Sequence, residues 1–377
     1  MALIARITRR LFIVLNILAA IAFLIACANR YINPGDWWYL ALLGLFFPFM
    51  VVAHIIFVIG WLLARSKWAL LSLIMLIVGF TNISALVGIN FRSEFKTAKT
   101  DSTLRILSWN VHQFGLFEGY KKGLITRKQM LDYIKEQNAD ILCFQEFIKD
   151  IPSGTNHVSI FELLQNLGYP YSFCGEDYIQ TKGKYSMGVA IFSKFPITDS
   201  FRIRYQGDTG SMSAESLLAA DILYQGKPIR IFTTHLQSNR VAKDEYSTII
   251  SRRVVRDGGL GASKSVVKKL KVAYTHRSAQ ADKVAAALDA SPYPEVLAGD
   301  FNDIPNSYTY FRIRKNRLDA FQEKGWGLGR TFSHISPTLR IDYIMADKSF
   351  EVMQYKRNLL PYSDHYPIIA DLQLKGR

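Results

Sequence analysis

Cysteine and acidic residues are scarce in this sequence. The chain has 377 residues but only three cysteines, Cys27, Cys143 and Cys174. So few thiols exclude a disulfide scaffold, and the fold must rest on its own hydrophobic core. Asp and Glu number 31 against 46 Lys and Arg, which gives a formal net charge of +15. An apolar fraction of 49% with 13% aromatic residues excludes disorder as the main state.

Charge is missing altogether from three long stretches within the first hundred residues. They run over Leu11–Ala28, Trp37–Leu63 and Trp68–Asn90. A helix of about 20 apolar residues crosses the hydrocarbon core of a bilayer, so each stretch is expected to be a transmembrane helix. Tryptophans at their ends, such as Trp61, suit the membrane interface. The sequence thus predicts a membrane anchor over residues 1–100 and a second domain over residues 101–377.

Basic residues beside these stretches predict how the chain crosses the membrane. Arg6, Arg9 and Arg10 precede the first stretch, and Arg65 and Lys67 lie between the second and the third. Because positive charges stay on the cytoplasmic side, we expect a multi-pass protein of the cell (inner) membrane whose second domain is extracytoplasmic. Three basic residues between positions 92 and 99 favour the opposite orientation, but charges that lead into a long domain count for less.

Short apolar runs alternate with helical patterns from Thr103 onward. Strands are predicted over Leu104–Asn110, Ile141–Gln145, Tyr171–Cys174, Met187–Ser193, Leu217–Tyr224, Pro228–Thr234, Glu295–Ala298, Arg340–Ala346 and Ile368–Leu372. Helices are predicted over Arg127–Asn138, His157–Leu167 and about Ala262–Ala290. Strands that are interrupted by helices indicate an α/β domain with helices outside a mixed sheet system.

The excess positive charge of this second domain is concentrated in one insertion. Between Arg240 and Arg277 there are ten basic and three acidic residues, a net charge of +7. Three interpretations are open: a groove for a nucleic-acid backbone, a surface for anionic lipid headgroups, or a solvated helix face.

Side chains that bind metals or move protons follow many of the predicted strands. They are Asn110, Glu146, His235, Asp300, Asn302, Asp342, Asp364 and His365. Each one alone is an ordinary turn former or solvated group. Loops at strand ends converge in α/β folds, so we expect these side chains to form one active site.

Together these residues supply what metal-assisted cleavage of a phosphate ester needs. The carboxylates of Glu146 and Asp364 and the amide oxygen of Asn110 are hard ligands that suit Mg²⁺. A pair such as Asp300 and Asn302 can orient and deprotonate an attacking water molecule.

Two histidines complete this chemistry. His365, held by Asp342, can act as a base or stabilise charge on the transferring phosphoryl group. His235 can donate a hydrogen bond to the same phosphate oxygens.

The motifs Trp-Asn, Gln-Glu, Thr-His-Leu, Gly-Asp-Phe-Asn, Ile-Asp-Tyr and Ser-Asp-His occur in this order between Leu104 and Leu374. In this the chain resembles the endonuclease/exonuclease/phosphatase superfamily. The resemblance implies a DNase I-like, four-layer α-β-β-α sandwich with the active site at one end, here preceded by three transmembrane helices.

The resemblance also implies roles for the matching residues. Asn110, Glu146 and Asp364 would form the metal site, which takes Mg²⁺ or Mn²⁺. Asp300 and Asn302 would position the nucleophilic water, and His365, oriented by Asp342, would face the phosphate. His235 would stabilise the phosphate or act as an acid. DNase-like members give this histidine an acidic partner, for which Glu176 is the candidate here.

The expected function is that of a membrane-tethered, divalent-metal-dependent phosphoesterase. It would hydrolyse a phosphodiester by in-line attack of water, and its partners would be the lipid bilayer and the phosphate-ester substrate. The substrate is either a phospholipid or sphingolipid headgroup or a nucleic acid. Two alternatives are a tethered nuclease acting on DNA or RNA, and a catalytically silent relative that binds lipid or a partner.

Overall fold

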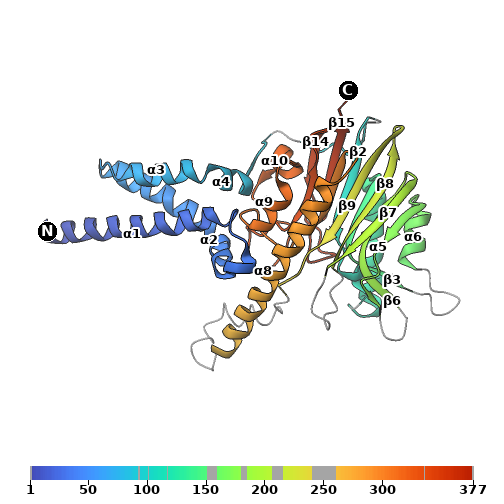
Figure 1. Cartoon of the computed structure of the whole chain (residues 1–377), viewed down its shortest axis with the longest axis horizontal. Coiled ribbons are helices and arrows are strands. Elements are labelled where there is room, and N and C mark those ends of the chain that lie inside the picture. Colours follow the sequence, from blue (N-terminus) through green and yellow to red (C-terminus); the bar gives the residue numbers. More distant parts are fainter. Residues whose placement is uncertain are drawn as a thin grey trace.

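The computed structural model describes residues 2–91, 94–100, 102–116, 118–150, 159–179, 185–205, 215–239, 260–334 and 336–375. A bundle of helices projects from a body built of two β-sheets, and the N-terminus lies at the far end of the bundle (Figure 1). The apolar first part of the chain therefore forms a separate arm of the molecule.

Two helices of the arm, α1 (Ala2–Ala28) and α2 (Pro34–Leu63), are long and apolar enough to cross a membrane. The third predicted span is not one straight helix. It consists of α3 (Ala69–Val78) and α4 (Phe80–Leu86), which are bent by 66°. Only if this bent pair counts as one span does the arm contain three.

The bend occurs at Gly79, where the arm is tightly packed. A Cβ atom on Gly79 would lie 2.4 Å from the ring of Phe23 in α1. Glycine is therefore needed for the close approach of α1 to the junction between α3 and α4. This tertiary contact is what the uninterrupted apolar pattern did not reveal.

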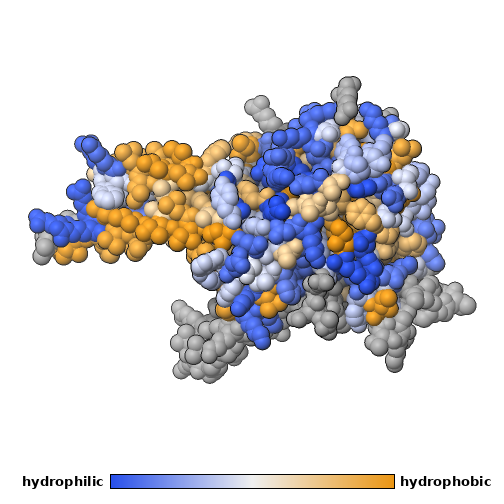
Figure 2. All heavy atoms as spheres, viewed as in Figure 1, coloured by the Kyte–Doolittle hydropathy of each residue, from blue (hydrophilic) through white to orange (hydrophobic). Residues whose placement is uncertain are grey.

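The outer surface of the arm is apolar over most of its length (Figure 2). Large exposed side chains on it include Leu11, Val14, Leu18, Phe46, Phe49, Ile56, Leu70, Ile74 and Ile77. A contiguous apolar surface of this size needs a cover other than water, and a bilayer provides it. The arm therefore associates with a membrane.

A buried polar cluster ties the three helices of the arm together. His54 Nδ1 in α2 lies 3.0 Å from Ser72 Oγ in α3. Ser72 Oγ in turn donates to Asn16 Oδ1 in α1 at 2.7 Å. In apolar surroundings such interhelical hydrogen bonds fix which faces of the helices meet.

The remainder of the described chain is a sandwich. One sheet has the strand order β14 (Phe350–Arg357), β15 (Ile368–Leu374), β2 (Leu104–Asn110), β3 (Ile141–Asp150), β6 (Tyr185–Ser193) and β4 (Tyr171–Cys174), with β5 (Tyr178–Ile179) also paired to β6. The other has the order β11 (Leu318–Asp319), β13 (Asp342–Ala346), β10 (Glu295–Asp300), β9 (Lys227–His235), β8 (Ser216–Tyr224) and β7 (Ile197–Arg204). A short pair, β1 (Gly88–Ile89) and β12 (Trp326–Gly327), lies where the arm meets the sandwich.

Alternating side chains build the layers. In β2, Leu104 and Ile106 belong to the core between the sheets, whereas Leu107 and Trp109 pack outward against α5 (Tyr120–Gln137). On the other sheet, α8 (Leu260–Asp289) and α9 (Tyr308–Arg314) cover the outer face. Helices thus lie outside two face-to-face sheets (Figure 1), and the predicted four-layer sandwich is confirmed. Smaller elements are η1 (His112–Gly115), α6 (Ile160–Asn166) and α10 (Ala320–Lys324).

Most predicted strands and helices are present, but the long strands β7 and β14 were missed, as were the two-residue strands β1, β5, β11 and β12 and the helices α9 and α10. Both β7 and β14 lie at sheet edges, where exposed and charged residues interrupt the apolar pattern. The predicted helix Arg127–Asn138 begins earlier, at Tyr120. Residues 157 and 158 of the predicted helix His157–Leu167 lie outside the described residues.

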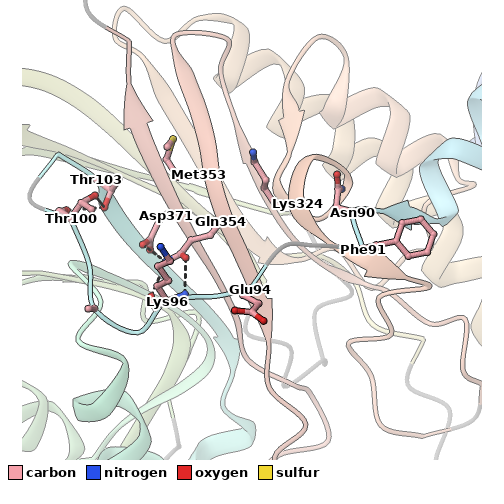
Figure 3. Close-up of a pocket in the computed structure, with 11 residues that line it drawn as sticks. Asn90, Phe91, Glu94, Lys96, Thr100, Thr103, Lys324, Met353, Gln354 and Asp371 are labelled. Atoms are coloured by element: carbon pink, nitrogen blue, oxygen red, sulfur yellow. Dashed lines mark hydrogen bonds between the residues drawn. The ribbon is translucent and has the colours of Figure 1, made fainter.

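The linker between the arm and the sandwich follows the edge strand β14. Lys96 N donates to Gln354 Oε1 at 2.9 Å, and Gln354 Nε2 donates to Lys96 O at 3.0 Å (Figure 3). This amide therefore pairs with the linker as another strand would. A cavity of about 690 Å³ opens beneath the linker, and none of the predicted site residues lines it.

Gly299 is required where β10 approaches β9. A Cβ atom there would lie 2.3 Å from Thr234 O and 2.9 Å from Thr234 N. We therefore expect Gly299→Ala to lower the stability of the sandwich by about 1–3 kcal/mol and to lower the thermal unfolding midpoint of the detergent-solubilised protein. Gly60→Ala adds the same methyl group where the nearest atom is 3.4 Å away, and should leave the midpoint unchanged. Equal midpoints for both variants would contradict this packing.

Candidate active site

Strand alternation brings the predicted polar residues to one end of the sandwich, between its sheets. In β2, Leu104 and Ile106 face the opposite sheet, and Asn110 has the same parity at the end of the strand. In β9, Ile229 and Ile231 face inward, and the same spacing continues to His235. Apolar residues thus fill the middle of the sandwich, and polar ones follow at its end.

The neighbouring strands repeat this arrangement. Val296 and Ala298 of β10 belong to the central core, and Asp300 ends the strand with the same parity. Antiparallel β13 begins with Asp342, which pairs in register with Asp300. Parallel β9 places His235 opposite Asp300 on the other side. Asp300 therefore lies at the centre of the group.

Glu146 reaches the site through an irregularity in β3. The register with β6 shifts between Phe144 and Phe147, and both rings pack outward. Glu146 has a φ of 50°, which is uncommon for a residue other than glycine. Such a bulge turns a side chain out of its regular place in a strand. As a result, Gln145 bridges to Thr233 Oγ1 at 3.0 Å while Glu146 turns toward Asn110.

Asn110 connects the two sheets of the site. Its Nδ2 atom donates to Glu146 Oε1 at 3.2 Å and to Asp300 Oδ2 at 3.1 Å. Its Oδ1 atom accepts from the backbone N of His112 at 3.2 Å. In this orientation the amide holds both carboxylates in place, and its role as a metal ligand stays a prediction.

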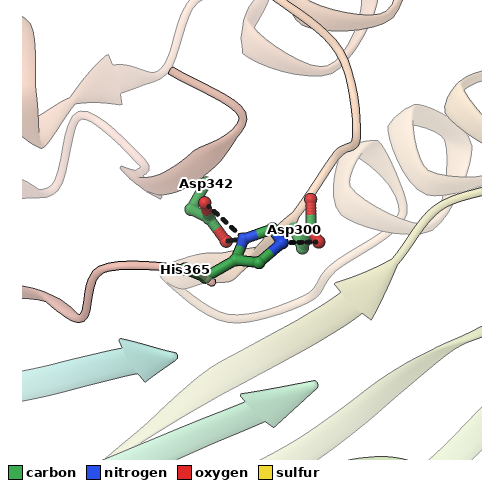
Figure 4. Close-up of side chains that lie close together, drawn as sticks. All are labelled: Asp300, Asp342 and His365. Carbon is green, nitrogen blue, oxygen red and sulfur yellow. Dashed lines mark hydrogen bonds and ion pairs between the residues drawn. The ribbon is translucent and has the colours of Figure 1, made fainter. Parts of the chain in front are cut away.

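Asp300, Asp342 and His365 form a buried cluster (Figure 4). His365 Nδ1 lies 3.0 Å from Asp342 Oδ2, and His365 Nε2 lies 3.7 Å from Asp300 Oδ2. Burial opposes the charge on His365, but the two carboxylates outweigh it and raise the pKa of His365 well above its usual value. Burial, together with Asp342, raises the pKa of Asp300.

His235 approaches Asp300 from the other side. Its Nε2 atom lies 3.6 Å from Asp300 Oδ2, so both histidines present Nε2 to the same carboxylate oxygen. A phosphate group at this place would meet two imidazoles.

Besides Asp300, the acidic residue whose charge interacts with His235 is Asp177 and not the expected Glu176. Glu176 lies 3.2 Å from Lys149 Nζ, and its side chain is 42% exposed. The side chain of Asp177 is only 4% exposed, and its charge interacts with that of His235. The two adjacent residues lie in the short connection between β4 and β5 and have different surroundings, which the sequence motif did not resolve.

Asp364 and His112 form the more open side of the site. His112 Nδ1 lies 3.6 Å from Asp364 Oδ1 and 3.7 Å from Glu146 Oε2. Burial alone would raise the pKa of Asp364, but the charges of His365, His112 and His334 hold it below its usual value. His112 was missed in the sequence, although it follows Asn110 by only two positions.

Asn302 stabilises the loop after β10. Its backbone N donates to Asp300 Oδ1 at 2.8 Å, and its φ of 52° is one that asparagine tolerates better than most residues. Its Nδ2 atom donates to Leu236 O at 2.9 Å. Asn302 therefore lies beside Asp300 as expected, and its side chain joins the loops that follow β9 and β10.

The residues present fit a divalent cation. In the described parts of the chain, the ion-pair partners of Glu146, Asp300, Asp342 and Asp364 are histidines, and no lysine or arginine neutralises these carboxylates. Oxygen donors of this kind are the ligands that Mg²⁺ and Ca²⁺ prefer. Ligand atoms of Asp300, Asp342 and His365 also lie within 4.8 Å of one another, which is close enough to hold a metal.

Only part of the basic insertion lies within the described residues. Residues 240–259 are outside them. Lys268 and Lys271 are exposed on α8, whereas Arg277 is buried, donates to Gln237 O at 2.9 Å and lies 3.4 Å from Asp303. Arg277 thus supports the fold near the site and is not part of a basic surface.

The four-layer sandwich carries a cluster of carboxylates and histidines at one end, which is an arrangement suited to the hydrolysis of phosphoesters. The family model of the endonuclease/exonuclease/phosphatase family matches residues 107–365, and the chain belongs to this family. A second family model, a domain of unknown function (DUF8431), matches residues 9–86. A search of curated proteins finds no match.

Solved structures agree with this assignment of the fold. An endonuclease/exonuclease/phosphatase from Beutenbergia cavernae is 21% identical, has a TM-score of 0.51, and is aligned over 73% of this chain and 72% of its own. The catalytic domain of human nocturnin with a bound sulfate anion is 20% identical, has a TM-score of 0.52, and is aligned over 76% and 98%. At these identities the similarity concerns the fold alone.

The surroundings of Asp177 predict opposite effects on stability and activity. Burial raises the pKa of Asp177, so the folded protein binds the proton of this carboxyl more tightly than the unfolded chain does. The stability that this carboxyl contributes is present at acid pH and is lost as the pH rises through its folded-state pKa. Asp177→Asn should therefore keep or raise the unfolding midpoint at pH 7. It should also lower kcat for a phosphodiester by about 10- to 100-fold, because His235 loses its charged neighbour.

Glu176→Gln is the matched control for Asp177→Asn. Because Glu176 pairs with Lys149 on the surface, we expect the control variant to retain activity and stability. If Glu176→Gln lost activity and Asp177→Asn kept it, the assignment of the acidic neighbour would be wrong.

Proposed function

We propose that the chain is a membrane-anchored, divalent-metal-dependent phosphodiesterase that hydrolyses the headgroup of a membrane lipid. The main support is the packing of the active-site loop against the membrane arm. Asn306, in the loop that follows β10, donates from Nδ2 to Ala26 O near the end of α1 at 3.2 Å. The loop therefore packs directly against the end of a membrane helix, in the buried junction between the arm and the sandwich.

The chain length between the arm and the site supports a substrate in the membrane surface. Asp300 is six positions before Asn306, and an extended chain spans at most about 3.5 Å per residue. The catalytic carboxylate is therefore within about 20 Å of Asn306. A lipid headgroup is within reach of such a site without leaving the bilayer, whereas a nucleic acid would have to be brought to it.

We infer a multi-pass topology with the sandwich on the extracytoplasmic side. Arg6, Arg9 and Arg10 lie in the first part of α1, and Arg65 and Lys67 lie between α2 and α3. Both groups lie at the ends of these helices away from the sandwich. The positive-inside rule assigns those ends to the cytoplasm.

Glu146 and Asp364, with Asn110 beside them, are the residues that we propose to hold the cation. Their side chains are the more exposed carboxylates of the site, at 24% for Glu146 and 32% for Asp364. When bound, a divalent cation supplies positive charge for the phosphate oxygens. The Asp300–His365–Asp342 cluster is buried and joined by its own hydrogen bond and ion pairs, so it suits proton transfer better.

In the proposed reaction Asp300 is the base. Its raised pKa suits the removal of a proton from water, and Asn302 shapes the loop that holds it. The water oxygen attacks phosphorus, and the bond to the leaving oxygen breaks on the opposite side. His365, oriented by Asp342, and His235 donate from Nε2 to the phosphoryl oxygens. The leaving oxygen takes a proton from solvent and Asp300 returns the proton of the attacking water to solvent, so that an alcohol and a phosphomonoester are released.

The substrate assignment is tested with full-length protein in Mg²⁺. Mixed vesicles of phospholipid and sphingomyelin and supercoiled DNA are offered in parallel. We expect release of a phosphorylated headgroup, and a fall in rate of at least 100-fold in Asp300→Asn, which cannot accept the proton. DNA nicking that Asp300→Asn abolishes, without headgroup release, would instead identify a tethered nuclease. Full activity of Asp300→Asn would contradict the role of Asp300.

The metal site has a test that does not depend on turnover. Titration calorimetry of the full-length protein with Mg²⁺ should show binding that Glu146→Gln weakens at least tenfold, since a carboxylate ligand is lost. Glu351→Gln removes an exposed carboxylate of β14 and is the control. Equal Mg²⁺ affinity of Glu146→Gln and the wild type would exclude Glu146 as a ligand.

A further inference from the structure

Helix α4 lies between the arm and the sandwich: Leu86 packs in the core of the arm, and Ala85 packs in the core of the sandwich. It follows the 66° bend after α3 and ends at Leu86. Asn82, Ala85 and Leu86 of this short helix are buried. Two polar contacts join it to segments that carry catalytic residues.

The first contact reaches the loop that follows β10. Asn82 Nδ2 donates to Asn306 Oδ1 at 2.5 Å and to Cys27 O at 3.3 Å. Both asparagines are buried. Asn306 follows Asn302 by four positions. One end of the catalytic loop is thereby fixed by a hydrogen bond that water cannot replace without opening the interface.

The second contact reaches the segment that enters β13. Arg340 Nη2 donates to Ala85 O at 2.8 Å, and Arg340 Nη1 pairs with Asp319 Oδ2 at 2.7 Å. The guanidinium is fully buried, so loss of either partner would leave part of it unsatisfied. Arg340 precedes Asp342 by two positions, and Asp342 orients His365.

The two segments also hold each other. The hydroxyl of Tyr343 lies 2.8 Å from Asp303 O and 2.7 Å from Arg340 O. Phe301 N donates to Ile341 O at 2.8 Å. A shift at either contact with α4 would therefore displace both the loop that carries Asn302 and the carboxylate of Asp342 that orients His365.

We propose that α4 is a positioning helix for the active site and that Asn82 is its principal positioning residue. The arm would then have a second role besides attachment to the membrane, because its last helix holds the catalytic segments in their reactive geometry. This inference rests on the proposed phosphodiesterase function. It also accounts for the bend at Gly79, which turns α4 out of the line of α3 and onto the sandwich.

The test compares Asn82→Ala with Thr81→Ala in full-length protein in detergent. Thr81 is the neighbour of Asn82 on α4, and its side chain is exposed. Bis(p-nitrophenyl) phosphate with Mg²⁺ is the probe, since a soluble diester removes any effect of membrane orientation. We expect Asn82→Ala to lower kcat about tenfold or more with KM within about twofold, because displacement of catalytic groups by about 1 Å costs rate and not binding. Thr81→Ala should match the wild type.

A double mutant separates positioning from general destabilisation. If Asn82 acts through Asn306, the variant Asn82→Ala/Asn306→Ala should have the same kcat as Asn306→Ala alone. If each substitution instead lowered kcat through its own loss of stability, the two effects on kcat would add in the double mutant. Fully additive effects on kcat would overturn the proposal.

Amide hydrogen exchange provides a readout that needs no turnover. Asn82→Ala should speed exchange in residues 301–306 and 338–343 while the central strand β6 keeps its protection, which reports an intact fold. Unchanged exchange in both segments, or an unchanged kcat, would overturn the proposal. Faster exchange in a protein that hydrolyses no diester would support the positioning role and contradict the phosphodiesterase function.

Discussion

A carboxylate buried at the end of a strand is the constraint on which this site depends. Asp300 has no solvent exposure, so its charge must be compensated from within the protein. The amide of Asn110, the backbone N of Asn302, and the imidazoles of His235 and His365 all converge on its two oxygens. Both sheets and the loops at one end of the sandwich are therefore arranged around this one group.

Much of this arrangement could be predicted from the sequence, because alternation in a strand is local. Once a strand end is fixed, the inward parity of Asn110 and Asp300 follows. The bulge that turns Glu146 into the site depends on how Phe144 and Phe147 pack, and the pattern does not contain that information. The same applies to Asp177, which replaces the expected Glu176.

The membrane arm shows the same division between local and tertiary information. Apolar length was sufficient to identify α1 and α2. The apolar pattern did not reveal the break between α3 and α4. This break depends on the contact between Gly79 and Phe23 and on the packing of α4 against the sandwich. The match to the domain of unknown function ends at residue 86, the last residue of α4. We propose that this helix, and not residue 100, is where the arm meets the catalytic module.

Hydrolysis in water enriched in ¹⁸O tests the central claim most directly. Full-length protein with Mg²⁺ would act on phospholipid vesicles, and mass spectrometry would locate the heavy oxygen in the products. Attack of water on phosphorus by a site built around Asp300 predicts that ¹⁸O enters the phosphorylated product and that Asp300→Asn incorporates it at least 100-fold more slowly. Heavy oxygen in the alcohol product, or label incorporation at an undiminished rate in Asp300→Asn, would contradict the account.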